Sequence, residues 1–226
     1  MANYAVSDLH GNYKIWAEIR AWLKPQDTLY VLGDCADRGL DGWKIIKEAL
    51  KMPNVVYIKG NHEELLRKAM LEYYSECPES YPHYALLVHN GGYETYAAWV
   101  DEGANIEYAS ILRGLPTQAT YYNKDDIEII MTHAGYTPPN EPTDESELLW
   151  NRNHFSDSWN YKANALIVHG HTPITYIPGA KDWKERGAYW YCNNHKVCLD
   201  TSCWRSNYCV VLELDNFDEH IFYLED

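Results

Sequence analysis

The chain has 226 residues, of which 46% are hydrophobic and 23% are charged, and it carries a formal net charge of −14. This acidic charge argues against a nucleic-acid partner, which needs clustered Lys and Arg, and no stretch approaches the roughly 18 consecutive apolar residues of a membrane span. The start, "MANYAVSDLHG", lacks a secretory signal, so we expect a cytoplasmic protein. The length suits one hydrophobic core, so we expect a single domain over residues 1–226, and a monomer by default.

Apolar runs rich in β-branched residues alternate with helical patterns at the start of the chain. The runs "NYAVSD", "TLYVLGD" and "NVVYIKGN" each predict a strand. Between the first two, "KIWAEIRAWLK" places Ile15, Ile19 and Leu23 four residues apart, and "GWKIIKEALK" has similar helical spacing before the third. This order of strand, helix and strand predicts parallel βαβ units with right-handed crossovers.

The middle of the chain, residues 64–115, is predicted to be a helical insertion that caps one side of the sheets. It begins with "EELLRKAMLEYY" and is rich in aromatic residues, namely Tyr73, Tyr74, Tyr81, Tyr84, Tyr93, Tyr96 and Trp99. Ordinary packing with the hydroxyl tips at the surface is favoured over a wall that stacks phosphotyrosine or bases. Glu63 and Glu64 are expected to stabilise the start of this helix rather than to catalyse.

Two more strands are predicted after the insertion, at "IEIIMTH" and "ALIVHGH". Between them, the Pro-rich stretch "YTPPNEPTDESE" at residues 136–147 is expected to be a long loop and a candidate wall of the active site. The chain has no internal repeat that would indicate several domains.

Six cysteines occur, and they are Cys35, Cys77, Cys192, Cys198, Cys203 and Cys209. Reduced thiols are expected because no export signal precedes them. The last four crowd together with His195, which would suit zinc, but they contain no C-x-x-C pair. Buried or hairpin-facing thiols are therefore the favoured interpretation.

Every one of the five predicted strands ends in polar side chains that can bind metal or phosphate. These are Asp8 and His10, then Asp34, Asp37 and Arg38, then Asn61 and His62, then His133, and finally His169 and His171. Open α/β sheets bind ligands beyond the carboxyl ends of their strands, so we expect these groups to meet. One histidine near a strand end is most often structural, but five such endings predict a metal site.

The types of ligand indicate the kind of metal site. Asp, His and Asn without thiolate suit divalent ions such as Mn²⁺, Fe or Zn²⁺, of which Mn²⁺ is our first choice. The ligands are too many for one four-coordinate ion, so two ions are expected, with a carboxylate such as Asp34 bridging them. Paired ions roughly 3.5–4 Å apart can clamp the oxygens of an in-line displacement at phosphorus. The pattern predicts phosphate ester hydrolysis.

The motifs "SDLHG", "GDCADRG", "GNHE", "THAG" and "HGHT" resemble, in this order, those of the calcineurin-like metallophosphoesterases. "GDCADRG" together with "GNHE" is similar to the phosphoprotein phosphatase branch, and "LLWNR" and "LDTS" extend the similarity to its compact lambda-type serine/threonine phosphatases. The resemblance runs from residue 7 to about residue 202. It implies an α/β fold, a four-layer αββα sandwich with mixed sheets and a helical cap.

The resemblance also implies a role for each motif residue. Asp8, His10 and Asp34 would hold one metal, and Asp34, Asn61, His133 and His171 would hold the other. His62 would be the general acid, hydrogen-bonded to Asp37, while Arg38 and Arg152 would bind phosphate oxygens. Metal-bound hydroxide would attack phosphorus directly. Imidazole can donate a proton to an alkoxide near neutral pH, and the fork of arginine suits two phosphate oxygens, so elementary chemistry agrees.

Three positions depart from the usual motifs of this branch. Ser7 and Ser202 stand where glycine is common, and "THAG" differs after its histidine. None of these changes removes a ligand, so we expect altered loop packing with catalysis retained. His169 lies two residues before His171 on the same side of an extended strand, but the branch does not use this position, and a supporting or packing role is favoured.

These features predict a dinuclear-metal phosphomonoesterase that acts on phosphoserine, phosphothreonine or phosphotyrosine in proteins or peptides. The main alternative is a hydrolase of dinucleoside polyphosphates such as diadenosine tetraphosphate, because that family has similar motifs and size. A nucleic-acid phosphatase or nuclease is disfavoured by the acidic charge. A non-catalytic metal-binding module is disfavoured because His62, Asp37, Arg38 and Arg152 are all present.

Overall fold

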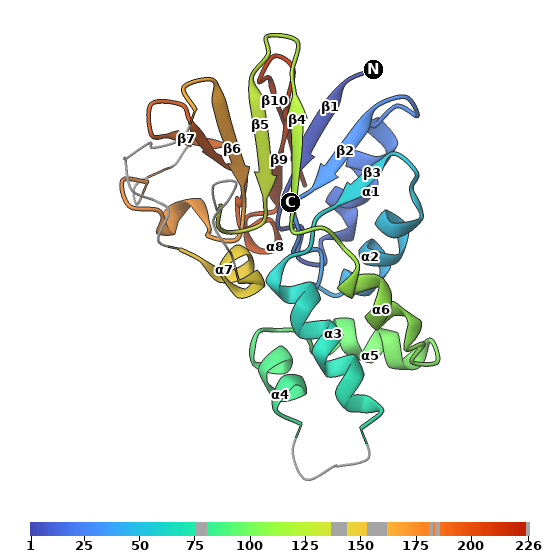
Figure 1. The fold of residues 1–226 in the computed structure, drawn as a ribbon. Coiled ribbons are helices and arrows are strands. Elements are labelled where there is room, and N and C mark those ends of the chain that lie inside the picture. Colours follow the sequence, from blue (N-terminus) through green and yellow to red (C-terminus); the bar gives the residue numbers. More distant parts are fainter. Residues whose placement is uncertain (76–80, 137–143, 153–161, 181–182, 184–185, 225–226) are drawn as a thin grey trace.

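Two mixed β-sheets face each other in the computed structural model, which describes residues 1–75, 81–136, 144–152, 162–180, 183 and 186–224 (Figure 1). The first sheet has the order β10–β9–β1–β2–β3 and comprises β1 (Asn3–Val6), β2 (Thr28–Val31), β3 (Val55–Tyr57), β9 (Tyr208–Glu213) and β10 (Glu219–Tyr223). The second has the order β4–β5–β6–β8–β7 and comprises β4 (Gln118–Tyr122), β5 (Glu128–Thr132), β6 (Ala165–His169), β7 (Tyr189–Tyr191) and β8 (Lys196–Cys198). The α/β sandwich predicted from the sequence is confirmed.

The predicted βαβ units form the first part of the chain. β1, β2 and β3 are parallel, and they are connected through α1 (Tyr13–Trp22) and α2 (Gly42–Lys51). α1 begins after Asn12, whose side chain accepts a hydrogen bond from the backbone N–H of Ile15. Ile15 and Ile19 are fully buried, as their spacing predicts. The parallel arrangement sends the three strand ends of this sheet to the same edge.

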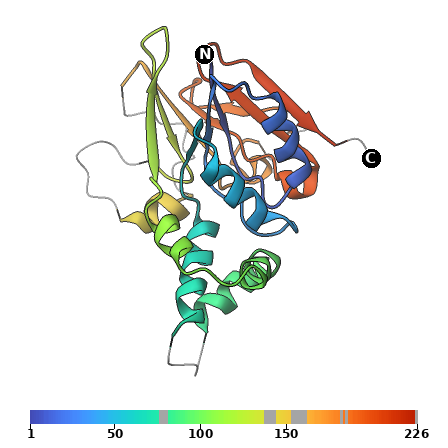
Figure 2. The same ribbon diagram turned by 90° about the vertical axis from the view of Figure 1, so that its right-hand side faces the viewer.

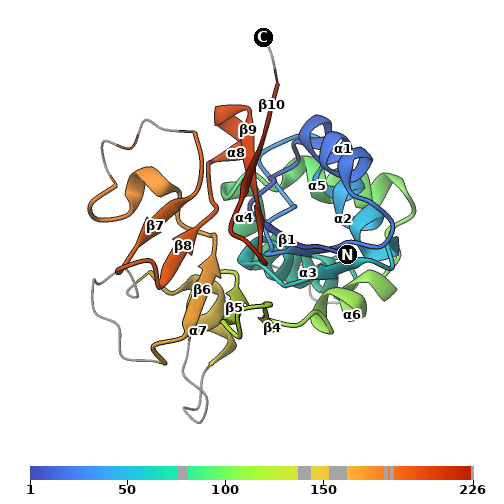
Figure 3. The same ribbon diagram turned by 90° about the horizontal axis from the view of Figure 1, so that it is seen from above.

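Three separate hydrophobic clusters correspond to the interfaces between layers. Alternate residues of β1 face opposite ways, so Tyr4 and Val6 pack against α1 and α2 while Ala5 packs against the second sheet. A third cluster on the outer face of the second sheet joins β7 and β8 to η1 (Ile174–Tyr176). Viewed from above, α1 and α2 lie outside the first sheet and the second sheet lies on its other side (Figure 3). In the described residues, a 3₁₀ helix and its loop form the fourth layer.

The helical insertion projects beyond the edge of the sandwich (Figure 2). It consists of α3 (Asn61–Tyr73), α4 (Pro82–His89), α5 (Tyr93–Asp101) and α6 (Glu107–Arg113). Its aromatic rings pack mainly against one another, because Trp99 is fully buried and Tyr73, Tyr74 and Tyr96 surround it with ring centroids 5.4 to 6.5 Å away. The packing interpretation of this segment is confirmed.

The predicted loop at residues 136–147 and the predicted buried cysteines lie in the later part of the chain. The stretch from 136 to 147 was expected to be a loop, but α7 (Glu145–Trp150) begins inside it, and the Asp144 side chain caps this helix by accepting from the Ser146 N–H at 3.1 Å. Residues 137–143 lie outside the described residues, as does Cys77. The other cysteine side chains are buried, and Cys203 begins the short helix α8 (Cys203–Ser206). No helix in the described part of the chain combines the length and apolar character needed to cross a bilayer.

Candidate active site

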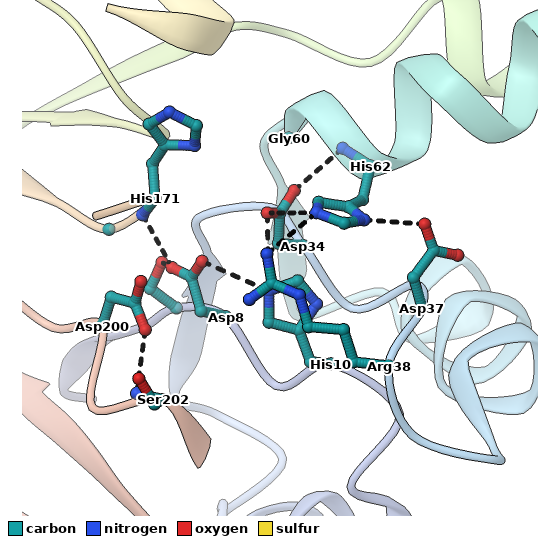
Figure 4. A network of polar contacts seen from close by, with 12 residues as sticks. Asp8, His10, Asp34, Asp37, Arg38, Gly60, His62, His171, Asp200 and Ser202 are labelled. Carbon is teal, nitrogen blue, oxygen red and sulfur yellow. Dashed lines mark hydrogen bonds and ion pairs between the residues drawn. The ribbon is translucent and has the colours of Figure 1, made fainter. Parts of the chain in front are cut away.

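The loops after β1, β2, β3, β5 and β6 bring the predicted ligand residues to one edge of the sandwich. Figure 4 shows Asp34 between His62 on one side and Asp8 on the other. The side chains that are buried there are Asp8, His10, Asp34, Asp37, Asn61, His62, His133 and His171. Arg38 and Arg152 are exposed. The site therefore has a buried base rich in carboxylate and imidazole and a solvent-facing side with two positive charges.

The backbone at this edge adopts the left-handed conformation at many non-glycine positions. The φ angles are 54° at Asp8, 41° at His10, 53° at Asp34, 68° at Asp37, 65° at Arg38 and 67° at His171. Such residues cost of order 1–3 kcal/mol each and persist where the surrounding structure determines them, most often at functional sites. Their concentration at the predicted ligands supports a functional role for this edge.

Asp34 lies between two groups of possible metal ligands. Its Oδ2 is 3.6 Å from His10 Nε2 and 3.8 Å from His62 Nε2, whereas its Oδ1 is 3.4 Å from His133 Nε2. Two clusters of side chains are close enough to hold an ion, namely His10, Asp34 and His62, and Asp34, His133 and His171. Because His62 is also hydrogen-bonded to Asp37, we assign only His10 and Asp34 of the first cluster to a metal. The two oxygens of one carboxylate therefore face different groups, which is the geometry that a bridging ligand needs.

The first group also includes Asp8, whose Oδ1 lies 3.7 Å from His10 Nε2. Neither of these buried atoms has a hydrogen-bond partner among the described residues. The Nδ1 of His10 donates to the carbonyl oxygen of Ala36 at 2.8 Å, so in the neutral ring Nε2 carries a lone pair toward Asp8 and Asp34. Unpartnered acceptors that converge in this way fit a cation.

The second group converges on Asn61. Its Oδ1 is 2.9 Å from His133 Nε2 and 2.9 Å from His171 Nδ1. The Nδ1 of His133 donates to the Leu32 carbonyl at 2.7 Å, so its Nε2 is an acceptor in the neutral ring. With this orientation of the Asn61 amide the two atoms are both acceptors, and a divalent ion bound beside them could share both. The donor set of oxygen and imidazole nitrogen suits the ions predicted above.

The pKa values of the ligand residues reflect their burial and their crowding. Burial, together with Asp200 and Asp34, raises the pKa of Asp8 well above its usual range, while burial and the nearby His62 lower the pKa of His10. Burial also lowers the pKa of His171 to about 2. Burial opposes ionisation of Asp34, but the surrounding histidines outweigh it and hold the pKa of this carboxyl below its usual range. Bound cations would keep the imidazoles neutral and would favour the ionised form of both carboxylates, which for Asp8 opposes the effect of burial.

His62 and Asp37 form the predicted pair beside the first group. The Nδ1 of His62 donates to Asp37 Oδ2 at 2.7 Å, and its Nε2 faces the exposed guanidinium of Arg38 at 3.2 Å. Burial works against a charged His62, but Asp34 and Asp37 outweigh it and raise the pKa of this histidine. His62 is therefore held where a raised pKa and an oriented ring suit a general acid.

Arg152 lies on the other side of the site. Its Nη1 donates to the hydroxyl of Thr172 at 2.7 Å, and the half-exposed Trp150 packs edge-on against His171 with ring centroids 6.1 Å apart. Arg152 thus borders the group formed by the second sheet, whereas Arg38 borders His62. The two guanidinium groups are placed beside different groups of ligands.

Glu63 has a structural role that the sequence indicated only in part. Its carboxylate accepts from the Gly60 N–H at 2.9 Å, which confirms the predicted role at the start of α3. It also accepts from the backbone N–H groups of Asp34, Cys35 and Ala36 at 2.8 to 3.2 Å, and from the Tyr57 hydroxyl. One buried carboxylate therefore fixes the whole turn after β2. By contrast, Glu64 pairs with Arg67 on the same helix.

Asp200 is a buried acid of the site to which the sequence analysis assigned no role. It follows β8, its Oδ1 accepts from the Ser202 N–H at 2.9 Å, and its Oδ2 has no hydrogen-bond partner among the described residues. Burial raises its pKa to about 6. An acid directly after a strand is the same signal that identified Asp8 and Asp34, but the strand "KVC" was too short to be predicted.

Ser7, which departs from the usual motif, and His169 both lie next to the ligand residues. The hydroxyl of Ser7 donates to Asp8 Oδ2, so the serine at this position helps to hold a ligand residue in place. A Cβ on Gly170 would come within 1.8 Å of the Ser7 Oγ, which explains the glycine in "HGHT". His169 is buried with Nε2 2.8 Å from the Tyr191 hydroxyl. It belongs to neither ligand group among the described residues, in agreement with the supporting role favoured above.

This site defines a metal-dependent phosphoesterase. The chain belongs to the calcineurin-like phosphoesterase family, whose family model matches residues 4–215.

Two curated proteins of the same description resemble the chain over part of its length. It is 28% identical over 145 residues to a symmetrical bis(5'-nucleosyl)-tetraphosphatase of Photorhabdus laumondii, and the match covers 61% of this chain but 46% of that protein. A Hamiltonella defensa protein of the same description is 26% identical over the same coverage. The chain therefore spans about half the length of these curated relatives.

Solved structures share the fold at low sequence identity. A candidate diadenosine tetraphosphatase superposes with a TM-score of 0.67 at 16% identity, over 99% of this chain and 94% of the other. A serine/threonine phosphatase from Saccharomyces cerevisiae superposes with a TM-score of 0.63 at 14% identity, over 100% of this chain and 81% of the other. These likenesses support the fold and leave the substrate open.

Proposed function

We propose that this protein hydrolyses the phosphoanhydride bonds of dinucleoside polyphosphates such as diadenosine tetraphosphate. The observation that carries the proposal is the separation of the two exposed arginines, Arg38 beside His62 and Arg152 beside Thr172. A polyphosphate has charged phosphates on both sides of the bond that breaks, so one guanidinium can bind on each side. The description of the curated relatives as symmetrical tetraphosphatases supports the same choice.

The residues that would hold two divalent ions are those of the two groups: Asp8, His10 and Asp34 in the first, and Asp34, Asn61, His133 and His171 in the second. Ions bound there would neutralise phosphate charge, polarise the phosphoryl oxygen and activate water for attack. The protein's own contribution is to keep these side chains in place. Backbone carbonyls of Ala36 and Leu32 orient His10 and His133, so little reorganisation is needed.

His62 would hold the proton for the leaving group at Nε2, because Nδ1 is occupied by Asp37. In the structure a nitrogen of Arg38 faces this Nε2, and the charge of Arg38 acts to lower the pKa of His62. Binding of a phosphate to Arg38 would draw the guanidinium away and leave Nε2 free to carry its proton. A nucleoside diphosphate leaves as a weak base, so it needs this proton less than an alkoxide does.

A second candidate is the phosphoprotein phosphatase favoured by the sequence. The complete and buried His62–Asp37 pair supports it, because an alkoxide from serine or threonine must be protonated as it leaves. The curated relatives favour the dinucleotide over this first choice from the sequence.

The test is a comparison of kcat/KM for diadenosine tetraphosphate, a phosphoserine peptide and a bis-aryl phosphodiester, each with Mn²⁺ supplied. We expect the tetraphosphate to be the best substrate and chromatography to detect two molecules of ADP as products. A higher kcat/KM for the phosphopeptide would contradict the proposal and select the second candidate. ATP and AMP as products would contradict symmetrical cleavage while leaving the class of substrate unchanged.

A further inference from the structure

A small pocket opens beside the first group of ligands, between the loops that follow β1 and β2 and the segment of α8. Its volume is about 260 Å³, and the residues that line it include His10, Tyr13, Leu40 and Trp204. Ligand pockets for drug-sized molecules start at roughly 300 Å³, so this space suits one ring system rather than a whole dinucleotide. It adjoins the phosphate site because His10 lines both.

Trp204 is held in this pocket although it is 41% exposed. The preceding Cys203 is fully buried, and its carbonyl accepts from the Asn12 side chain at 3.2 Å, which ties α8 to the loop after β1. The indole therefore belongs to a fixed segment and keeps much of its apolar surface in water. An aromatic side chain that is fixed beside a site and partly open to solvent can serve as a stacking surface for a ligand.

Two guanidinium groups lie near the same indole. The Cζ atom of Arg38 is 5.8 Å from the ring centroid of Trp204, and that of Arg205 is 5.7 Å from it. Arg38 also contacts His62, so one side chain connects the proposed proton donor to the indole. In a chain with a net charge of −14, this local positive charge beside an aromatic face complements a ligand that carries both phosphates and a planar base.

We propose that Trp204 stacks against one nucleobase of the substrate and that the pocket is its nucleoside subsite. The inference rests on the proposed function and adds where a base binds. Base–aromatic stacking tolerates any base because every base has a π-face. Arg38 and Arg205 would then contact the phosphates next to that nucleoside. The exposed side chain of Leu40 adds apolar surface to the same pocket.

The test uses Trp204→Leu, which keeps apolar bulk but removes the aromatic face, and Trp204→Phe, which keeps a smaller face. The matched control is Trp190→Leu, since Trp190 on β7 lines a separate pocket with Ile127 and Ala165 at the opposite ends of the strands. For each full-length, metal-loaded variant, KM is measured with diadenosine tetraphosphate and with inorganic tripolyphosphate, which has phosphates but no base.

Trp204→Leu is expected to raise KM for diadenosine tetraphosphate roughly 5- to 150-fold, which is the range that base–aromatic stacking energies give, with less than a twofold change for tripolyphosphate. Trp204→Phe should recover most of the loss, and Trp190→Leu should change neither KM. An equal loss on tripolyphosphate would overturn the proposal and leave Trp204 as a residue that only positions Arg38. An unchanged KM for the dinucleotide would also overturn it.

A binding measurement separates this inference from the proposed function. Calorimetric titration of the His62→Asn protein with ADP, with and without Trp204→Leu, reports base binding whether or not the dinucleotide is the best substrate. ADP affinity that falls with Trp204→Leu while tripolyphosphate affinity does not supports the subsite. If Trp204→Leu instead weakens only a phosphopeptide, the pocket binds a peptide side chain and the nucleobase assignment is wrong.

Discussion

The two sheets contribute to the site in different ways. The first sheet presents the turn from residue 33 to 38, and the backbone of this turn is fixed by the carboxylate of Glu63, which follows β3 of the same sheet. The second sheet presents His133 and His171 at strand ends, and both are held by the first: His133 donates to the Leu32 carbonyl, and the His171 N–H donates to Asp8 Oδ2 at 2.9 Å. This asymmetry implies that damage to the first sheet's turn disturbs both metal groups, whereas loss of a second-sheet ligand stays local.

The largest effect is expected from Asp34→Asn. Because the two oxygens of Asp34 face different groups, this variant should lose most of both metals and nearly all activity. His171→Ala, its counterpart on the second sheet, should retain the metal of the first group. Metal content of the purified proteins, measured by mass spectrometry, checks both. Two full equivalents of metal in Asp34→Asn would refute the bridging role.

His62→Asn should keep both metals and lose activity according to the leaving group. With an alkyl phosphate we expect a loss of roughly 10²- to 10⁴-fold, because its alkoxide must be protonated as it leaves. The loss should be clearly smaller with an aryl phosphate and with diadenosine tetraphosphate. Steady-state kinetics on the three substrates measure this. Equal losses on all three would indicate that His62 positions the substrate and donates no proton.

Glu63→Gln tests whether the turn after β2 depends on one carboxylate. An amide keeps one acceptor but turns a donor toward backbone N–H groups, so we expect a loss of about 2–4 kcal/mol in the free energy of unfolding. For a chain of this length, that corresponds to a fall in Tm of roughly 5–15 °C. Metal affinity of both groups should fall with it.

The matched control is Glu64→Gln, one residue further along α3, where the largely buried side chain pairs with Arg67 of the same helix and, among the described residues, hydrogen-bonds to no backbone group of the turn. A glutamine there keeps an acceptor for the guanidinium, so we expect a smaller loss of about 1 kcal/mol. Thermal unfolding in the absence of metal, followed by metal titration, compares the two variants. Similar Tm values for both would show that the contacts of Glu63 are not what holds the turn.

The smallest effects are expected from Arg38→Ala and Arg152→Ala, at roughly 10-fold each in kcat/KM for diadenosine tetraphosphate. If the arginines bind phosphates on opposite sides of the broken bond, the double variant should lose about the product of the single losses. Strong non-additivity would place both arginines on the same phosphate. That result would favour a single terminal phosphate, as in the phosphoprotein phosphatase alternative.

Much of the first sheet could be predicted from the sequence because its signals are local. The runs before Asp8, Asp34 and Asn61 are short and β-branched, the intervening helices have clear apolar spacing, and parallel strands must end at the same edge. That reasoning was enough to place ligand residues from five separate segments at one site. Five strands, β4, β7, β8, β9 and β10, were not predicted. β7 and β8 have three residues each, β4 and β10 mix polar with aromatic residues, and the apolar run of β9 leads into no motif residue that would single it out.

Only the tertiary structure showed which residues support the ligands and which residues form the neighbouring pocket. Glu63 looked like an ordinary first-turn acid, but three of its five donors are backbone N–H groups of the turn after β2, whose approach no local pattern encodes. Asp200 and Trp204 belong to the site because β8 and α8 fold back beside the loop after β1, almost 200 residues away in the chain. Composition and periodicity act over a few residues, whereas these contacts depend on how two sheets pack. The sequence by itself therefore determined the chemistry of the site, and the packing of the sheets decided its support and its pocket.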